Sequence, residues 1–210
     1  MKQRIRQLID QRVLHSPELI AAFEKVNRSD FLRRFNKTAD EVESESEMDA
    51  PVPIGEAQTN SQPYTVAFML ELLQVEPGQN ILDVGAGSGW TTCLLAELAG
   101  KKGKVTAIEL LASLKEFGQK NAEAYGYKNL SIVLGDGSRG WPKASPYDRI
   151  HVAASTDTIP PALLEQLAPR GRMVIPVGND IVLVKKSKDG SIDEERHPGF
   201  AFVPLESDAS

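Results

Sequence analysis

Residues 82–89 read Leu-Asp-Val-Gly-Ala-Gly-Ser-Gly, and the architecture expected for the whole chain starts from this run. An apolar strand leads into glycines at 85, 87 and 89, and an apolar stretch over 91–98 then predicts a helix. Glycine lets the backbone adopt positive φ and approach a bound molecule, while a helix start offers free N–H groups. The run therefore predicts a strand, a ligand-binding turn and a helix.

An acidic residue stands at the expected distance from the glycines. Glu109 ends a second predicted strand, 104–108, about 20 residues further on, where a doubly wound sheet places a carboxylate against ribose hydroxyls. Both an adenosine-bearing methyl donor and a dinucleotide satisfy this spacing. A dinucleotide fingerprint has its third glycine one residue later than Gly89, at the position of Trp90, so the methyl donor is favoured.

The rest of the chain alternates between strand-like and helix-like segments, as a parallel sheet with crossover helices requires. We expect an α/β, doubly wound, mostly parallel, seven-stranded Rossmann-like sheet. The expected strands are 80–84, 104–108, 130–134, 148–153, 172–176, 181–185 and 200–204, and the expected helices are 88–99, 112–125 and 160–168. The last two strands are joined through 187–190, which leaves no room for a crossover helix, so they should be antiparallel.

The first 60 residues have a different character. Helical periodicity over 1–35 predicts an N-terminal helical cap, and the six acids between 39 and 49 predict a solvated, mobile loop. Prolines and a glycine over 51–55 predict an irregular path, and Pro63 predicts the first turn of a helix. We expect a single domain, with 1–60 as cap and substrate-side loop and 61–210 as the cofactor-binding core.

Composition excludes several classes of function. A chain of 210 residues with 41% hydrophobic and 25% charged residues suits one globular enzyme domain. A net charge of −5 without basic runs argues against nucleic-acid binding, and no apolar stretch is long enough to span a membrane. We expect a cytoplasmic monomer. His15, His151 and His197 are too dispersed to predict a metal site, His151 is expected to be structural, and Cys93 to be a buried packing residue.

A third segment of the predicted cofactor site is Gly135-Asp136-Gly137, which follows the 130–134 strand. Asp-Gly often forms only a tight turn. At the carboxyl edge of a sheet that carries Asp83 and Glu109, Asp136 can also accept a hydrogen bond from an adenine amino group. The two interpretations are compatible.

Together these residues resemble the protein-L-isoaspartate O-methyltransferases, over nearly all of the chain. The resemblance is carried by Pro51-Val-Pro-Ile-Gly-Glu-Ala-Gln-Thr-Asn-Ser-Gln-Pro-Tyr64, the 82–89 run, Gly135-Asp-Gly137, Ala144-Ser-Pro-Tyr-Asp148 and Gly171-Arg-Met-Val-Ile-Pro-Val-Gly178. The 82–89 pattern is common to many S-adenosylmethionine-dependent methyltransferases. The segment 58–63 is more particular and has the greater weight.

The resemblance implies methyl transfer from S-adenosylmethionine to the free α-carboxylate of L-isoaspartyl residues in damaged peptides and proteins. By match to the family's motifs, Ser61 is the active-site serine, and the substrate-binding positions are Gln58, Thr59, Pro176, Val177 and Gly178. The cofactor-binding positions are Asp83, Gly85, Gly87, Gly89, Glu109, Asp136 and Gly137.

The chemistry of the acceptor agrees with this implication. A carboxylic acid with a reference pKa of about 4 is ionised at neutral pH, so methyl transfer to it needs no general base, and the protein has to place and desolvate it. Ser61 could donate a hydrogen bond to the carboxylate. The alternative from the residues alone is that Ser61 caps the helix that starts at Pro63.

Two departures from the family pattern leave the acceptor open. The family's Ala-Tyr-x-Asp reads Ser46-Glu-Met-Asp49 here, so Glu47 replaces an aromatic residue, and the loop after Gly178 is short. Two alternatives therefore stand beside the isoaspartyl enzyme. One is a methyltransferase with a different, small-molecule acceptor, and the other is a donor-binding module without turnover.

Overall fold

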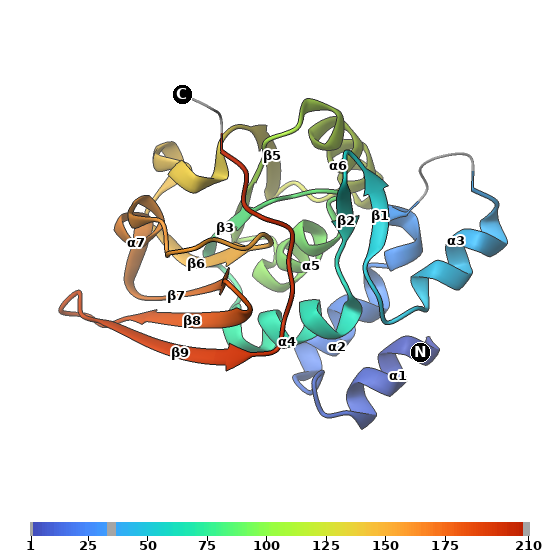
Figure 1. Ribbon diagram of the computed structural model, residues 1–210, viewed down its shortest axis with the longest axis horizontal. Helices are drawn as coiled ribbons and strands as arrows, with labels where there is room; N and C mark the ends of the chain where they lie inside the picture. The colour runs from blue at the N-terminus through green and yellow to red at the C-terminus, as the bar shows by residue number, and fades with distance from the viewer. Residues whose placement is uncertain (1, 33–36, 208–210) are drawn as a thin grey trace.

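A seven-stranded sheet forms the centre of the molecule in the computed structural model, which describes residues 2–32 and 37–207 (Figure 1). The strand order is β5-β4-β3-β6-β7-β8-β9, with β5 to β7 parallel and both β7–β8 and β8–β9 antiparallel. This order confirms the doubly wound, mostly parallel α/β sheet. The strands are β3 (Asn80–Val84), β4 (Lys104–Glu109), β5 (Leu130–Leu134), β6 (Tyr147–Val152), β7 (Leu167–Val177), β8 (Asp180–Lys186) and β9 (Ile192–Pro198).

Both faces of the sheet are buried, as an apolar parallel strand requires. Successive residues of β3 point to opposite faces, so Ile81 joins one hydrophobic cluster while Leu82 and Val84 join another. Helices cover the Ile81 face, and α7 with two short turns covers the other. The helices on the first face are α1 (Gln3–Asp10), α2 (Pro17–Lys25), α4 (Pro63–Leu73), α5 (Trp90–Ala99) and α6 (Ala112–Tyr125); α7 is Pro161–Gln166, and the turns are η2 (Gly137–Arg139) and η3 (Pro142–Ala144).

The N-terminal cap lies against the Ile81 face. Within the range 1–35, the structure has α1, α2 and the 3-10 turn η1 (Arg28–Phe31), while residues 1 and 33–35 lie outside the described part. Apolar side chains of α1 and α2 share one cluster with α4 and α5. The cap therefore belongs to the core of the protein, and the expected start of α4 at Pro63 is confirmed.

Residues 39–46 of the acidic segment form a helix, so the prediction of a mobile loop was wrong for them. α3 (Ala39–Ser46) begins with a capping box in which Thr38 and Glu41 exchange hydrogen bonds, and Val42 packs in a small cluster with Leu32 and Ile54. Lys2 pairs with Glu43 at 2.9 Å, which offsets part of the negative charge. Capping and one buried apolar residue outweigh the charge run.

One predicted strand and one predicted irregular segment need correction. The last strand is β9, at 192–198, and not 200–204, because the turn at 187–190 leads directly into a hairpin that pairs Lys186 with Ile192. The 51–60 segment also forms a hairpin, with β1 (Val52–Gly55) antiparallel to β2 (Gln58–Asn60). Its turn places Glu56 and Ala57 at positive φ, a conformation that these residue types do not signal.

Candidate active site

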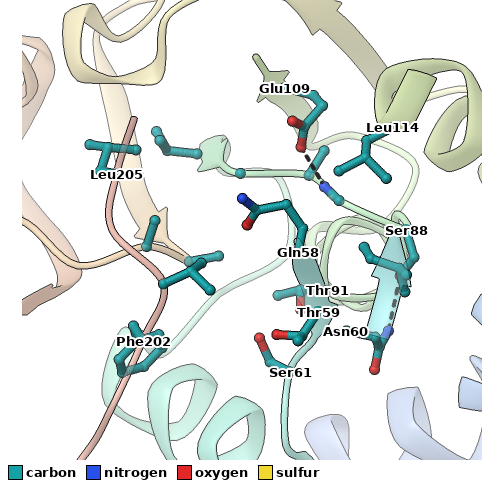
Figure 2. A pocket seen from close by; sticks show the side chains of 18 of the residues that line it. Gln58, Thr59, Asn60, Ser61, Ser88, Thr91, Glu109, Leu114, Phe202 and Leu205 are labelled. Atoms are coloured by element: carbon teal, nitrogen blue, oxygen red, sulfur yellow. Dashed lines mark hydrogen bonds between the residues drawn. The ribbon is translucent and has the colours of Figure 1, made fainter. Parts of the chain in front are cut away.

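A cavity of about 370 Å³ opens at the carboxyl ends of β3, β4 and β6, which is the switch point of the strand order. Its walls come from six segments of the chain: the glycine turn after β3 with the start of α5, the end of β4 with the start of α6, the β1–β2 hairpin with residues 61–65, Gly137, residues 153–154, and residues 201–206 (Figure 2). Its size suits a nucleoside-bearing ligand. The site is thus assembled from segments up to about 150 residues apart.

Two of the three glycines in the 82–89 run form part of the cavity wall. Gly85 and Gly87 have φ of +89° and +52°, and a Cβ at Gly87 would lie 3.3 Å from the Ile54 Cδ1 atom of the hairpin. Side chains there would strain the turn and narrow the cavity. The glycine turn therefore lets the backbone form the surface against which a ligand lies.

Glu109 lies in the cavity wall at the end of β4. Its Oε2 accepts a hydrogen bond from the Gly87 N–H at 2.8 Å, and its Oε1 accepts one from the Leu111 N–H at 3.1 Å. The carboxylate is held firmly, with its residue only 6% exposed, and it faces the cavity (Figure 2). A fixed acceptor at this point fits vicinal ribose hydroxyls.

Gly89 and Asp83 do not line this cavity, although the sequence indicated both as cofactor-binding. Gly89 is buried, and a Cβ there would lie 2.9 Å from the Gly118 carbonyl oxygen, so this glycine allows α5 to pack against α6. Asp83 is fully buried and accepts hydrogen bonds from Thr92 Oγ1 at 2.6 Å, with His151 Nδ1 at 2.8 Å from its other oxygen. Asp83 thus holds β3, β6 and α5 together beneath the turn.

In the Gly135–Gly137 segment, too, only some of the predicted residues line the cavity. Gly137 lines the cavity, and a Cβ there would clash with Val84. Asp136 is outside the lining and accepts hydrogen bonds from the backbone N–H and hydroxyl of Ser138. In this structure the turn interpretation therefore describes Asp136, while Gly137 gives the close approach.

The acceptor side of the cavity contains Gln58, Thr59 and Ser61, which lie across from Phe202 and Leu205 (Figure 2). Ser61 does not cap α4: the N-cap residue is Gln62, and the Tyr64 N–H in the first turn donates to Asp49 Oδ1 at 2.9 Å. The structure therefore argues against the capping interpretation of Ser61.

The segment Pro176–Gly178 does not line this cavity. Its backbone pairs with Thr156, whose N–H donates to the Pro176 carbonyl at 3.1 Å and whose carbonyl accepts from the Gly178 N–H at 2.9 Å. The wall that sequence reasoning missed is the extended stretch 201–206, attached where the Ser155 N–H donates to the Val203 carbonyl at 2.8 Å. Its residues had been interpreted as a strand, which is why their role was not foreseen.

Trp90 belongs both to the hydrophobic core and to the cavity wall. It is buried, packs edge-on against Phe23 at 5.6 Å between ring centroids, and also contributes to the cavity wall. Asn60 and Ser88 complete this side, joined by a hydrogen bond from Asn60 Nδ2 to Ser88 Oγ at 2.9 Å. Neither residue was selected from sequence, because such amides and hydroxyls have no characteristic pattern.

The remaining reactive side chains are structural. His151 is 2% exposed, and its Nδ1 lies 2.8 Å from Asp83 Oδ1. Its Nε2 is buried without a hydrogen-bond partner among the described residues, so the histidine is satisfied at one ring nitrogen only. Cys93 is fully buried, and burial raises the pKa of its thiol to about 12. Within the described residues, no group of three or more His, Cys, Asp or Glu could hold a metal ion, and no helix combines the length and apolar character needed to cross a bilayer.

The residues present fit a ribose-bearing donor that lacks a pyrophosphate. The carboxylate of Glu109 and the close approach at Gly85 and Gly87 suit the sugar, and Trp90 stands where the dinucleotide fingerprint has its third glycine. Fold and site together therefore define an S-adenosylmethionine-dependent methyltransferase.

Comparison with known proteins identifies the family. The chain belongs to the protein-L-isoaspartate(D-aspartate) O-methyltransferase family, whose model matches residues 1–210. It is 45% identical over 195 residues to the protein-L-isoaspartate O-methyltransferase of Pyrococcus horikoshii, covering 90% of this chain and 87% of the relative. It is 41% identical over 197 residues to the enzyme of the same name from Methanopyrus kandleri, covering 91% and 84%.

A solved structure shares the fold. The Plasmodium falciparum protein described as a protein-L-isoaspartate O-methyltransferase, crystallised with S-adenosyl-L-homocysteine, superposes with a TM-score of 0.82 over 97% of each chain, at 24% identity. The Rossmann-like fold is therefore common to both.

Proposed function

We propose that this protein transfers a methyl group from S-adenosylmethionine to the free α-carboxylate of L-isoaspartyl residues in damaged peptides and proteins, which initiates their repair. Membership of the family supports the reaction, and close relatives are named for it. The observation that carries the proposal is the position of Gln58, Thr59 and Ser61 in the wall of the same cavity as Glu109 and Gly85.

On the donor side, the proposed binding groups are Glu109 with the backbone of Gly85, Gly87 and Gly137. S-adenosylmethionine, when bound, supplies an electrophilic methyl group on a sulfonium. Glu109 is proposed to accept hydrogen bonds from the ribose hydroxyls while it keeps its bonds to the Gly87 and Leu111 N–H groups. A carboxylate has about four lone-pair sites, so these roles are compatible.

On the acceptor side, placement is the main task of the protein. The acceptor carboxylate is already ionised, so no residue has to remove a proton. The proposed role of Ser61 is to donate its hydroxyl hydrogen to one carboxylate oxygen and so direct the other toward the methyl carbon. Asp49 already occupies the Tyr64 N–H of α4, so the helix terminus contributes less to holding this anion than Ser61 does.

Exclusion of water is assigned to residues 201–206. Phe202 and Leu205 close the side of the cavity opposite Ser61 and leave an apolar surface there (Figure 2). An attacking carboxylate loses part of its hydration when it enters such a site, and this loss favours its attack on the methyl carbon. Pro176, Val177 and Gly178 remain proposed substrate residues outside this cavity.

The departure from the family pattern at Glu47 bears on specificity. Glu47 accepts a hydrogen bond from the Arg4 backbone N–H at 2.8 Å and is not part of the cavity wall, so it does not replace the missing aromatic surface. The missing aromatic surface favours the alternative in which the methyl group goes to a different acceptor. The division into 1–60 and 61–210, the cytoplasmic location, the monomeric state and the absence of nucleic-acid and membrane partners stay predictions from the sequence.

A matched pair of peptides tests the proposal. Peptides that differ only in one aspartyl or L-isoaspartyl linkage are incubated with the protein and methyl-labelled S-adenosylmethionine, and ester formation is measured. Labelling of the isoaspartyl peptide alone is expected. Equal labelling of both would favour another acceptor, and donor binding by calorimetry without any labelling would favour a module without turnover.

A further inference from the structure

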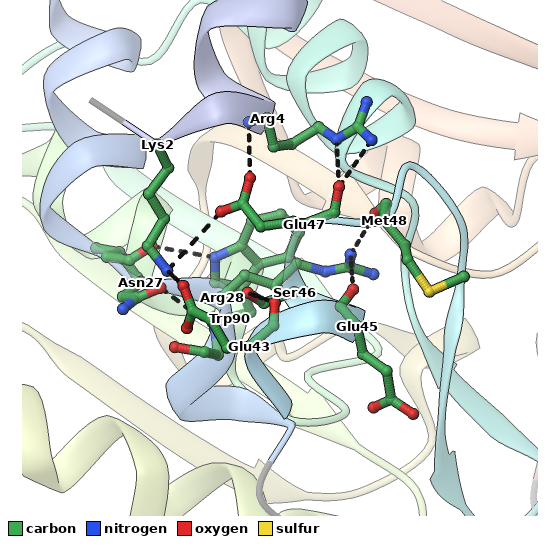
Figure 3. Close-up of polar contacts among 12 residues, drawn as sticks. Lys2, Arg4, Asn27, Arg28, Glu43, Glu45, Ser46, Glu47, Met48 and Trp90 are labelled. Atoms are coloured by element: carbon green, nitrogen blue, oxygen red, sulfur yellow. Dashed lines mark hydrogen bonds and ion pairs between the residues drawn. The ribbon is translucent and has the colours of Figure 1, made fainter. Parts of the chain in front are cut away.

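A single buried arginine connects the cap to both sides of the cavity. Arg28, the first residue of η1, is only 5% exposed, and its guanidinium lies among the backbone carbonyls of the segment that follows α3 (Figure 3). Arginine has five N–H donors in a rigid plane. All five find oxygen acceptors here, and none of those acceptors is a carboxylate.

The contacts of Arg28 close the loop from α3 to Ser61. Nη1 donates to the carbonyls of Met48 at 2.8 Å and Glu45 at 3.3 Å, and Nη2 donates to the carbonyls of Ala50 at 2.8 Å and Ser61 at 3.1 Å. Residues 45–61 therefore fold around one charged group. The carbonyl of Ser61 is one of the points at which the chain is held.

The same guanidinium reaches the donor side through Asn60. Its Nε donates to Asn60 Oδ1 at 2.8 Å, and Asn60 Nδ2 in turn donates to Ser88 Oγ at 2.9 Å in the turn before α5. The guanidinium carbon lies 5.4 Å from the ring centroid of Trp90, the first residue of α5. Arg28 thus contacts the acceptor segment directly and the donor segment through one amide and one ring.

Burial of a charged guanidinium costs more free energy than a purely structural contact requires. Burial lowers the pKa of Arg28 to about 10, an effect that the nearby charges of Asp49 and Glu45 oppose. An arginine that keeps its charge in such surroundings has to be paired with many dipoles. Lysine would retain the charge but has three donors, so it could not hold the same set of carbonyls.

We propose that Arg28 is a positioning residue for methyl transfer, which sets the Ser61 segment relative to the donor site through its bonds to Ser61, Asn60 and, by way of Asn60, Ser88. It touches neither donor nor acceptor. The inference rests on the proposed function, because its main consequence is the rate of transfer to the isoaspartyl carboxylate.

The test compares Arg28→Lys with a matched control, Arg149→Lys. Arg149 is also buried, at 7% exposure, and also donates to backbone carbonyls, those of Gln74 and Asp148 at 2.9 Å, but it does so at the opposite end of α4. For each variant, kcat and KM for the isoaspartyl peptide, the Kd of S-adenosylhomocysteine and the melting temperature are measured, with kinetics well below both melting temperatures.

Arg28→Lys is expected to lower kcat by roughly a hundredfold, the size of effect that about 1 Å of misplacement produces, with a change in product Kd of about threefold or less. Arg149→Lys should lower the melting temperature with kcat nearly unchanged. Equal losses of kcat in both variants, or a normal kcat in Arg28→Lys, would overturn the positioning role.

Amide hydrogen exchange keeps the inference separable from the proposed function. With S-adenosylhomocysteine bound, the amides of 58–62 should exchange faster in Arg28→Lys than in the wild type, and should be unaffected in Arg149→Lys. If the wild type fails to methylate the isoaspartyl peptide, the proposed function is wrong, and unchanged exchange in Arg28→Lys would independently reject the role of Arg28.

Discussion

Replacement of Ser61 by alanine separates the two roles that this residue could have. The hydroxyl lies in the cavity wall, while the N–H of Tyr64 in the first turn of α4 is already bound by Asp49 at 2.9 Å. Ser61→Ala should therefore reduce turnover and leave folding nearly unchanged. Asp49→Ala should lower stability, because it removes the group that caps the helix.

The expected magnitudes differ enough to be measured. A hydrogen bond to a charged group contributes about 1.5–3 kcal/mol, which corresponds to a loss in kcat of roughly tenfold to a hundredfold for Ser61→Ala. The Kd for S-adenosylhomocysteine should stay close to that of the wild type. Loss of a side-chain acceptor for an N–H in the first turn of a helix costs about 0.5–2 kcal/mol, so Asp49→Ala should melt a few degrees lower.

The assay combines steady-state methylation of the isoaspartyl peptide, calorimetry with the demethylated product and thermal unfolding by circular dichroism. Ser61→Thr, which keeps a hydroxyl, serves as the control and should retain part of the turnover. If Ser61→Ala instead melts several degrees lower and turns over normally, the hydroxyl is a structural group and the acceptor contact assigned to it does not exist.

Three further outcomes are expected. Glu109→Gln should raise the Kd for S-adenosylhomocysteine by roughly tenfold or more, because an amide cannot accept both backbone N–H bonds and ribose hydroxyls; an unchanged Kd in calorimetry would contradict this. Asp83→Ala should lower the free energy of unfolding by about 1–3 kcal/mol, since Thr92 and His151 lose their partner. The affinity of the folded variant for S-adenosylhomocysteine should stay close to normal. A variant that binds this product weakly but has normal stability would show that Asp83 belongs to the cofactor site. Cys93 should resist thiol reagents at pH 8 until the protein unfolds, because burial raises the pKa of its thiol from the ordinary 9.0 to about 12. Its contribution to stability is therefore full below pH 9 and is lost as the pH rises toward 12; melting curves of wild type and Cys93→Ala over this range check the sign.

Local patterns were sufficient for the elements of the sheet. The strands at 80–84 and 130–134 and the helix at 112–125 match the structure residue for residue, because apolar runs and turn residues act over a few positions. Such patterns failed where a few specific side-chain or backbone contacts decided the local structure. α3 forms in spite of its charge because Thr38 and Glu41 cap it, and no period marks the turn at Glu56 and Ala57.

The candidate site shows the same division. Gly85, Gly87 and Glu109 were found from spacing, since the turn and the next strand end are neighbours in any parallel sheet of this kind. Spacing cannot tell which way a side chain points. Asp83 alternates toward α5 and is buried there, so an acid next to the glycines became a structural group.

Sequence was thus enough to establish the methyltransferase sheet, its glycine turn and the family to which the chain belongs, because these depend on short, ordered patterns. Only the folded chain shows that residues 201–206 close the cavity and that Arg28 holds Ser61 and Asn60. Those contacts join residues about 30 to 150 positions apart. Their geometry arises when the cap, the hairpin and the C-terminal segment pack on the sheet, and no local pattern encodes it.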